Sequence, residues 1–193
     1  MSKPAFYGAL SAQEVFFYPD MALDALPERL HIDLPLGGKP GVQLLLRTGG
    51  EAIRLTLEGG GFAAEYYAMR AVPVEYNTGD GTQQGGAMVL EQRPAQKPDY
   101  ASRLAPFWVY DCLIEAPDGC IRAQDGLAAA YLCLCPDVQC RPGTYTLTLC
   151  AQCAEGEYCC ALDVRVYGVR VPQDAFPVTN WFSLDAIRRL HHV

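Results

Sequence analysis

The chain has 193 residues, of which 50% are hydrophobic and 19% charged, a composition that is typical of a globular protein and excludes a disordered one. Its formal net charge of −7 would repel a phosphate backbone, so we expect no nucleic-acid partner. The longest nearly apolar run, Leu127–Cys135, is too short for a membrane-spanning helix, and the N-terminal segment lacks the features of a secretory signal, so we expect no membrane partner and a cytoplasmic location.

Most of the chain divides into short segments in which hydrophobic and polar residues alternate, the pattern of a half-buried β-strand. In chain order, the predicted strands are Glu14–Tyr18, Arg29–Leu34, Val42–Thr48, Ala52–Glu58, Phe62–Asn77, Trp108–Ile114, Leu127–Cys135, Arg141–Ala151 and Glu157–Val171. Gly49 and Gly50 separate the third strand from the fourth, which predicts a hairpin with a glycine turn. Pro73 cannot donate a hydrogen bond to a neighbouring strand, so we expect a bend or an edge position near it.

Only the C-terminal segment, Phe176–Val193, departs from this alternation. Ser183 can cap a helix, Asp185 lies in its first turn, and Leu184 and Ile187 fall on one side of it. Two sheets must bury their apolar faces against each other. We therefore predict an all-β fold, a two-sheet antiparallel β-sandwich of jelly-roll or immunoglobulin-like type, with a short C-terminal helix.

All nine cysteines lie within Cys112–Cys160. Tyr131, Cys133 and Cys135 share one face of a predicted strand, and we expect such cysteines to be small buried hydrophobes. Structural zinc and native disulfides are the two alternatives. The zinc alternative depends on Cys133, Cys135, Cys150 and Cys153, whose spacing includes a single two-residue gap. We predict that the chain holds no cofactor.

No hydrolytic signature such as GxSxG or HExxH occurs in the sequence, so we expect no enzyme activity from this chain alone. Exposed aromatic side chains could instead stack on sugar rings, because an aromatic ring offers an apolar face beside a polar group. The candidates for glycan contact are Tyr66, Tyr100 and Trp108. The alternative for each of them is packing in the core of the sandwich.

Several segments in the second half of the chain occur in an order that is typical of a known family. They are "VPVEYNTG" (Val72–Gly79), "PDYASRLAPFWVYDCL" (Pro98–Leu113), "RPGTYTLTL" (Arg141–Leu149), "LDVRVYGVRVP" (Leu162–Pro172) and "FPVTNWFSLDAI" (Phe176–Ile187). Together they resemble the N-terminal β-sandwich of glycoside hydrolase family 123 and of related two-domain proteins. In that family the sandwich precedes a (β/α)₈ barrel, in which an adjacent Asp-Glu pair hydrolyses N-acetylgalactosaminides by a substrate-assisted mechanism.

The resemblance implies a division of the chain rather than a set of catalytic residues. No adjacent Asp-Glu pair occurs in the sequence, so no catalytic residue of the family can be carried over. Residues 1–175 would form the sandwich, and residues 176–193 would form the linker and the entering helix of an absent barrel. The expected contacts with that barrel are Trp181, Phe182, Leu184 and Ile187.

The function implied by the resemblance is that of a non-catalytic accessory domain, which supports a catalytic barrel in the same polypeptide and shapes the approach of a glycan. The parent protein would be a glycoside hydrolase that acts on N-acetylhexosaminides. A stand-alone carbohydrate-binding module and a zinc-stapled structural domain are the two alternatives.

Overall fold

The computed structural model describes residues 6–9, 17–21, 28–77, 95–99 and 101–170. Within these residues the regular secondary structure consists of β-strands alone. They are β1 (Phe6–Ala9), β2 (Arg29–Leu36), β3 (Gly41–Arg47), β4 (Ala52–Glu58), β5 (Phe62–Val74), β6 (Phe107–Glu115), β7 (Cys120–Arg122), β8 (Leu127–Pro136), β9 (Gly143–Cys153) and β10 (Gly156–Arg170). In these residues there is accordingly no helix that could cross a membrane. The helix predicted for the C-terminal segment lies outside the described residues.

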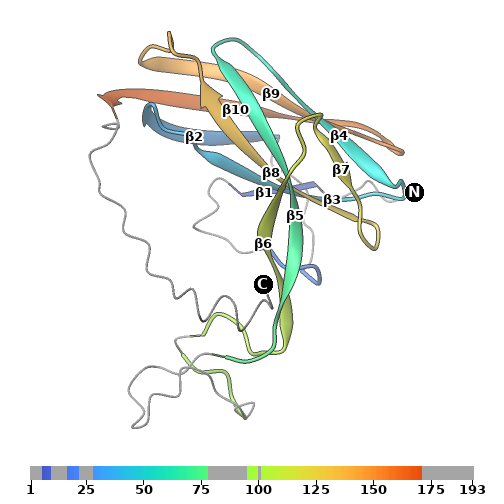
Figure 1. Ribbon diagram of the computed structural model, residues 1–193. Helices are drawn as coiled ribbons and strands as arrows, with labels where there is room; N and C mark the ends of the chain where they lie inside the picture. The colour runs from blue at the N-terminus through green and yellow to red at the C-terminus, as the bar shows by residue number, and fades with distance from the viewer. Residues whose placement is uncertain (1–5, 10–16, 22–27, 78–94, 100, 171–193) are drawn as a thin grey trace, which may run out of the picture.

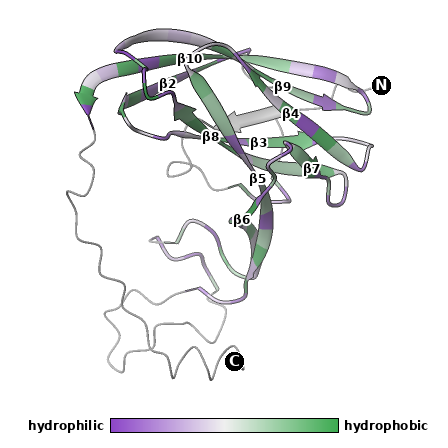
Figure 2. Cartoon of the chain, turned by 45° about the horizontal axis from the view of Figure 1, so that its top comes forward, coloured by the Kyte–Doolittle hydropathy of each residue, from purple (hydrophilic) through white to green (hydrophobic). Residues whose placement is uncertain are grey.

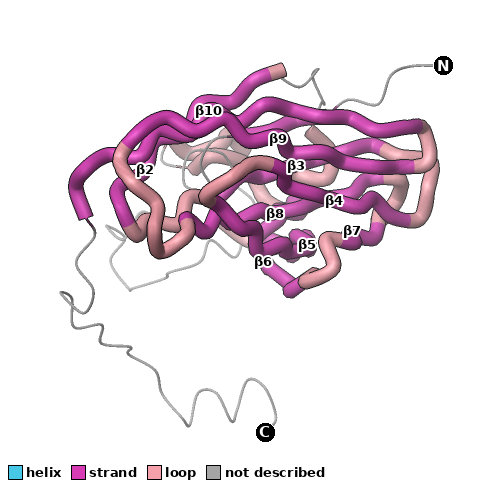
Figure 3. Tube along the Cα trace, turned by 90° about the horizontal axis from the view of Figure 1, so that it is seen from above, coloured by secondary structure: helices cyan, strands magenta, loops and turns pink. Residues whose placement is uncertain are grey.

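The strands form two five-stranded sheets that lie one against the other (Figure 1). Sheet A has the order β1-β3-β8-β5-β6, and sheet B has the order β2-β10-β9-β4-β7. The view from above shows that strands make up most of the described chain and that loops join them at the ends of the layers (Figure 3). The predicted all-β sandwich is confirmed.

One strand pair departs from the antiparallel arrangement. β2 pairs with β10 in parallel, with Leu30 opposite Leu162 and Ile32 opposite Val164. A parallel pair cannot be joined by a tight turn. The parallel pair is possible here because more than a hundred residues lie between the end of β2 and the beginning of β10. A strand near the beginning of the sequence thus lies beside the last strand of the described chain.

The core lies between the two sheets and follows the alternation seen in the sequence. Leu147 and Leu149 of β9 and Leu162 of β10 are fully buried on the inner face of sheet B. Leu132 and Leu134 of β8 are buried opposite them on sheet A, and β8 is coloured as hydrophobic along most of its length (Figure 2). Each such side chain contributes roughly 1.5–3 kcal/mol through its burial. The core of the sandwich is therefore the main source of its stability.

The outer face of sheet A carries a second, smaller apolar cluster, which the segment Phe17–Met21 covers. Phe17 is fully buried there with Leu45, Met69 and Tyr110. The backbone N–H of Tyr110 donates to the carbonyl of Phe17 at 2.9 Å, which fixes the segment along β6. Sheet A is therefore apolar on both faces in this region.

The paired ends of β5 and β6 extend beyond the two layers (Figure 1). β8 pairs with β5 only as far as Ala68, whereas β6 pairs with β5 as far as Val74. The register of the β5–β6 pair shifts between Arg70 and Ala71, and this irregularity lies close to Pro73, where the sequence predicts a bend. The extension gives β6 a stretch of surface that sheet B does not cover.

A small polar network lies at the far end of this extension, where β5 ends and β6 begins. The amide of Asn77, which is buried, donates to the carbonyl of Arg103 at 2.8 Å and accepts from the N–H of Ala105 at 2.9 Å. Arg103 in turn forms a bidentate pair with Asp20. Its guanidinium also lies 4.7 Å from the centre of the Tyr18 ring. The Phe17–Met21 segment is thus fixed to the end of the extension as well as to the sheet.

Four features of the fold differ from the predictions. The predicted hairpin of Val42–Thr48 and Ala52–Glu58 is wrong, because β3 belongs to sheet A and β4 to sheet B, so the Gly49-Gly50 connection crosses between the sheets. Of the predicted strand Glu14–Tyr18, only Phe17 and Tyr18 lie within the described residues, and they belong to an irregular segment in which Phe17 packs on the outer face of sheet A. β1 and β7 are short strands that the sequence does not predict. Each is stabilised by pairing with one neighbour, β3 and β4 respectively, and a few paired residues leave little periodicity in the sequence.

Candidate functional site

A cleft opens on the outer face of sheet A, around Tyr110 of β6. It consists of two adjoining hollows of about 350 and 320 Å³, which share Tyr110, Gln124 and Leu127 as walls. We call the smaller one the Trp108 cleft, and its remaining walls are Pro19, Arg47, Ala71, Trp108 and Asp125. Volumes of this size are at the lower end of the range for small-molecule sites.

The alternation of β6 places the two aromatic walls of the Trp108 cleft on the same side. Trp108 pairs with Pro73 and Tyr110 pairs with Ala71, so both rings leave the strand on its outer face. Tyr110 is buried at the floor, whereas Trp108 is 55% exposed at the rim. The small side chain of Ala71 leaves room between them.

A tight turn between β7 and β8 supplies polar groups on the opposite side. Gln124 and Leu127 exchange backbone hydrogen bonds of 2.8 and 2.9 Å around Asp125 and Gly126. Both central residues have positive φ, 52° for Asp125 and 74° for Gly126, the combination that an Asp-Gly hairpin turn adopts readily. The backbone N–H of Thr48 donates to the carbonyl of Gly126 at 3.0 Å and fixes the turn to the end of β3.

The electrostatics of the Trp108 cleft suit a neutral polar ligand. Burial raises the pKa of the Tyr110 phenol, and the nearby carboxylate of Asp125 raises it further. Tyr110 therefore stays protonated and can donate a hydrogen bond. Asp125 and Arg47 offer an exposed acceptor and an exposed donor group of opposite charge. The arrangement can hold a molecule with one apolar face and several hydroxyl groups, such as a sugar ring.

The structure places the three aromatic candidates for glycan contact differently. Trp108 is at the cleft and exposed. Tyr66 lies on the inner face of β5 and packs, partly buried, against the core, because its register position faces sheet B. Tyr100 lies outside the described residues. Sequence reasoning missed Arg47, Gln124 and Asp125, for which the only local signal was the Asp-Gly turn.

The four residues expected to contact a following barrel lie outside the described residues. They are Trp181, Phe182, Leu184 and Ile187. The expected domain boundary at residue 175 also lies in this part of the chain. Both stay predictions from the sequence.

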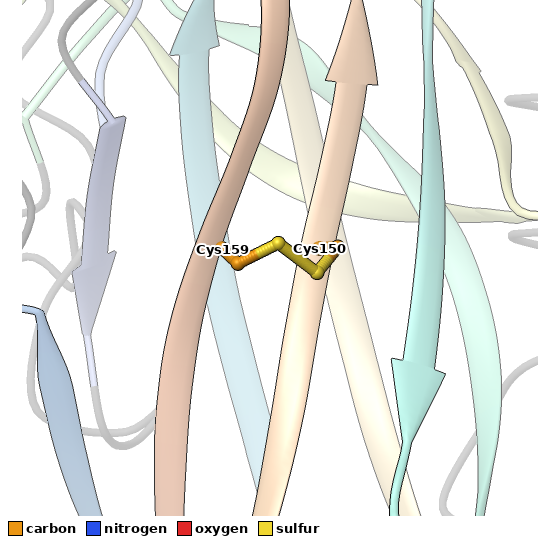
Figure 4. The surroundings of a disulfide bond; sticks show 2 residues. All are labelled: Cys150 and Cys159. Carbon is orange, nitrogen blue, oxygen red and sulfur yellow. A yellow bond between two sulfur atoms is a disulfide. The ribbon is translucent and has the colours of Figure 1, made fainter.

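The structure divides the four cysteines of the zinc alternative between the two sheets. Cys150 forms a disulfide with Cys159, which lies directly opposite it on β10, with the two Cα atoms 4.1 Å apart (Figure 4). This bond lies on the outer face of sheet B, whereas Cys153, three residues further along β9, faces the core. Residues three apart in a strand point to opposite faces, so Cys150 and Cys153 cannot share one ion. The four cysteines of the zinc alternative therefore do not form one ligand set, and the disulfide alternative holds for Cys150 and Cys159.

Cys133 and Cys135 remain thiols and share the outer face of β8, as the alternation predicted. Glu65 of β5 lies opposite Cys133, and its carboxylate is within 4.8 Å of both sulfur atoms. The ammonium of Lys39 contacts the Glu65 carboxylate at 2.9 Å. Sequence spacing gave no indication of Glu65, because it belongs to a strand more than sixty residues earlier.

A carboxylate with several hydrogen-bond donors lies at one end of the sandwich, in the turn between β9 and β10. Glu155 accepts hydrogen bonds from the thiol of Cys153, from the backbone N–H of Gly49 and, at 2.7 Å, from the hydroxyl of Thr48. These donors lower the pKa of Glu155 to about 2. The interaction joins a turn of sheet B to the connection between β3 and β4, so its role is structural.

Comparison with known proteins identifies the fold but no family. No family model matches the sequence, and no curated protein matches it. Among solved structures, a family 123 glycoside hydrolase from Clostridium perfringens matches 87% of this chain with 9% identity and a TM-score of 0.54. The cupredoxin domain of amoB from Nitrosocaldus yellowstonii matches 74% of this chain and 65% of that one, with 14% identity and a TM-score of 0.28.

The match to the Clostridium perfringens enzyme covers 28% of that enzyme. The structural study of that enzyme concerns the hydrolysis of glycolipid glycans. At 9% identity the likeness is one of fold: this chain has the architecture of one part of a longer glycoside hydrolase.

Proposed function

We propose that this chain is a non-catalytic accessory β-sandwich of a glycoside-hydrolase-like protein and that it supports a catalytic (β/α)₈ barrel in the same polypeptide. The observation that carries the proposal is the unequal coverage of the structural match, which includes 87% of this chain but 28% of the family 123 enzyme. A second, independent support is the sequence: five segments between Val72 and Ile187 resemble the sandwich of that family and occur in the same order along the chain. The parent protein then acts on N-acetylhexosaminides.

The described residues favour a supporting role over catalysis. No histidine lines either hollow of the cleft, and the only titratable walls of the Trp108 cleft, as far as the chain is described, are Arg47, Tyr110 and Asp125. Glycoside hydrolysis uses a pair of carboxyl groups on either side of the scissile bond, and the Trp108 cleft holds one, Asp125, whereas Glu115 and Asp118 line the other hollow. In this proposal the barrel supplies those groups, and the sandwich supplies a stable base beside it.

The first experiment is to read the coding sequence beyond Val193 and to express this chain with and without the downstream region. The expected reading frame continues into a βα repeat with an adjacent Asp-Glu pair, and the longer product hydrolyses a chromogenic N-acetylgalactosaminide. This chain alone should release no chromophore. A stop codon directly after Val193, or hydrolysis by this chain alone, would contradict the proposal.

The predicted contacts with the barrel can be tested in the same two proteins. Leu184→Asp and Ile187→Asp should lower the melting temperature of the longer product, because a charge would be placed in an apolar interface. The same substitutions should leave the melting temperature of this chain unchanged. An equal effect in both proteins would place these side chains within the sandwich instead.

A second candidate function is glycan binding at the Trp108 cleft, which the geometry of that cleft favours. An exposed indole beside Arg47, Gln124 and Asp125 combines a flat apolar surface with hydrogen-bonding groups, the usual composition of a sugar site. Calorimetric titration against a panel of N-acetylhexosamine oligosaccharides tests it. We expect saturable binding that Trp108→Ala abolishes.

A matched control is Tyr76→Ala, because Tyr76 is exposed to nearly the same extent, 53% against 55%, but does not line the cleft. This variant should bind as the unmodified chain does. Flat titrations across the panel, or equal losses in both variants, would remove glycan binding as a function of this cleft.

A further inference from the structure

Two thiols and a carboxylate converge on the outer face of sheet A, away from the Trp108 cleft. Cys133 and Cys135 are two residues apart in β8 and therefore point to the same side. The register of the neighbouring strand places Glu65 directly opposite Cys133. One ligand atom from each, two Sγ atoms and a carboxylate oxygen, lie within 4.8 Å of one another. We call these three residues the thiol cluster.

The spacing of the thiol cluster is close to that of a tetrahedral metal site. Two sulfur atoms bound to one Zn²⁺ at about 2.3 Å each lie about 3.8 Å apart, and a carboxylate oxygen binds at about 2.0–2.2 Å. Small side-chain rotations would bring the three ligand atoms from their present separation to these distances. The backbone already holds the three residues together, because β5 and β8 are paired on both sides of Glu65.

The two thiols are poorly suited to act as nucleophiles. Burial raises the pKa of Cys135 to about 11, with a further contribution from its hydrogen bond to the Glu65 carboxylate. Burial also raises the pKa of Cys133. A reactive cysteine needs the thiolate at neutral pH. A bound metal ion removes this barrier, because coordination displaces the thiol proton.

Glu65 has partners at both oxygens in the absence of an ion. Lys39 Nζ lies 2.9 Å from Oε1, and the Tyr67 hydroxyl donates to Oε2 at 3.3 Å. The Lys39 side chain is 56% exposed, so it can withdraw into solvent when Oε1 turns to an ion. Tyr67 would remain as the partner that orients the carboxylate, as outer-shell groups do in metal sites.

We propose that Glu65, Cys133 and Cys135 form a binding site for a thiophilic divalent cation of the zinc type, with the fourth position open to water. Two thiolates and one carboxylate are a ligand set that Zn²⁺ accepts and that Mg²⁺ and Ca²⁺ do not prefer. Three protein ligands with an open position resemble an exchangeable site more than a closed structural one. Among the described residues a second group has suitably placed atoms, Cys150, Glu157 and Cys159, but it is unsuitable because its sulfur atoms are joined in the disulfide.

The test uses Co²⁺ as a spectroscopic probe for the full chain, freed of metal with a chelator and kept without reductant so that the disulfide remains. We expect one Co²⁺ per chain, with tetrahedral bands in the visible range and a sulfur-to-cobalt charge-transfer band in the near ultraviolet. Zn²⁺ should bleach both. Binding should release protons and strengthen with rising pH, because both thiols lose theirs.

Variants assign the ligands. Cys133→Ser and Cys135→Ser should each weaken Co²⁺ binding by more than about tenfold and remove intensity from the charge-transfer band, and Glu65→Gln should weaken it by at least about tenfold. Cys112→Ser is the matched control, since Cys112 is a partly buried thiol on another strand, and it should bind normally. Lys39→Met should keep one ion per chain, because Lys39 is not a ligand.

A measurement on the unmodified chain guards against variants that fail to fold. Zn²⁺ should protect Cys133 and Cys135, but not Cys112 or Cys120, from alkylation by a maleimide, mapped by mass spectrometry. Absence of the charge-transfer band with Co²⁺ in slight excess, or no protection by Zn²⁺, would overturn the proposal. Full binding by Glu65→Gln, or loss of binding in Cys112→Ser or Lys39→Met, would overturn the assigned ligand set.

Discussion

The disulfide between Cys150 and Cys159 should stabilise the sandwich measurably. Its partners are nine residues apart in sequence, and closing a loop of that length in the unfolded chain costs about 2.6 kcal/mol at 25 °C by the chain-entropy relation. The double variant Cys150→Ser/Cys159→Ser removes this constraint from the unfolded state. We therefore expect a loss of up to about 2.6 kcal/mol in the free energy of unfolding.

Equilibrium unfolding in urea measures this loss. With a slope of about 2.5 kcal/mol per molar urea, the midpoint should fall by about 1 M, and the slope should change little. Reduction of the unmodified chain should produce a similar shift. The control is Cys112→Ser/Cys120→Ser, which removes two thiols without removing a bond and should shift the midpoint far less.

Two results would refute this reasoning. Titration of the denatured, unreduced chain should detect seven thiols, since two of the nine cysteines are bonded, and a count of nine would show that the bond is absent. A double variant as stable as the control would show that the native hairpin between β9 and β10 already persists in the unfolded chain, so that the bond adds no constraint.

The remaining predictions concern single residues. The pKa of Glu155 is lowered from 4.5 to about 2 in the folded chain, so its stabilising effect is full above about pH 4.5 and is lost as the pH falls towards 2. The variant Glu155→Gln should therefore show a weaker pH dependence of the melting temperature between these two pH values. Gly41→Ala should lower the free energy of unfolding in urea by about 1–3 kcal/mol, because the added Cβ would overlap the ring of Tyr131. Adding Tyr131→Ala to this variant should recover part of the loss, and strictly additive effects of the two substitutions would contradict the overlap. Leu132→Ala should cost about 2–5 kcal/mol, whereas Val138→Ala, at a side chain that is 96% exposed, should change stability by less than about 0.5 kcal/mol; similar values for the two would contradict the assigned core.

The alternation of hydrophobic residues in the sequence was sufficient to predict the sandwich and much of its core. The alternation within the predicted strands Arg141–Ala151 and Glu157–Val171 puts Leu147 and Leu149 on one face and Leu162 and Val164 on one face, and the structure buries all four in the core. This works because successive side chains of a strand point to opposite faces, so assigning one residue to a face also assigns every second residue along the strand. The same parity placed Cys133 and Cys135 on one face.

The candidate sites were less predictable, because they combine residues from distant parts of the chain. Trp108 could be named as an aromatic candidate, but its cleft also needs Arg47 from the end of β3 and Asp125 from the β7–β8 turn. Tyr66 carried the same signal as Trp108 and yet packs against the core. Aromatic residues serve both roles, and only their position in the sheet separates them.

The sequence by itself determined the longer strands, the alternation of their faces and most of the turns between them, since these depend on interactions between residues that are near one another in the chain. Only the tertiary structure decided which strands are neighbours. That choice joined Cys150 to Cys159 and not to Cys153, placed Glu65 beside Cys133, and set the first strand of sheet B parallel to the last. Neighbours in a sheet are selected by packing of the whole core, which no local pattern encodes.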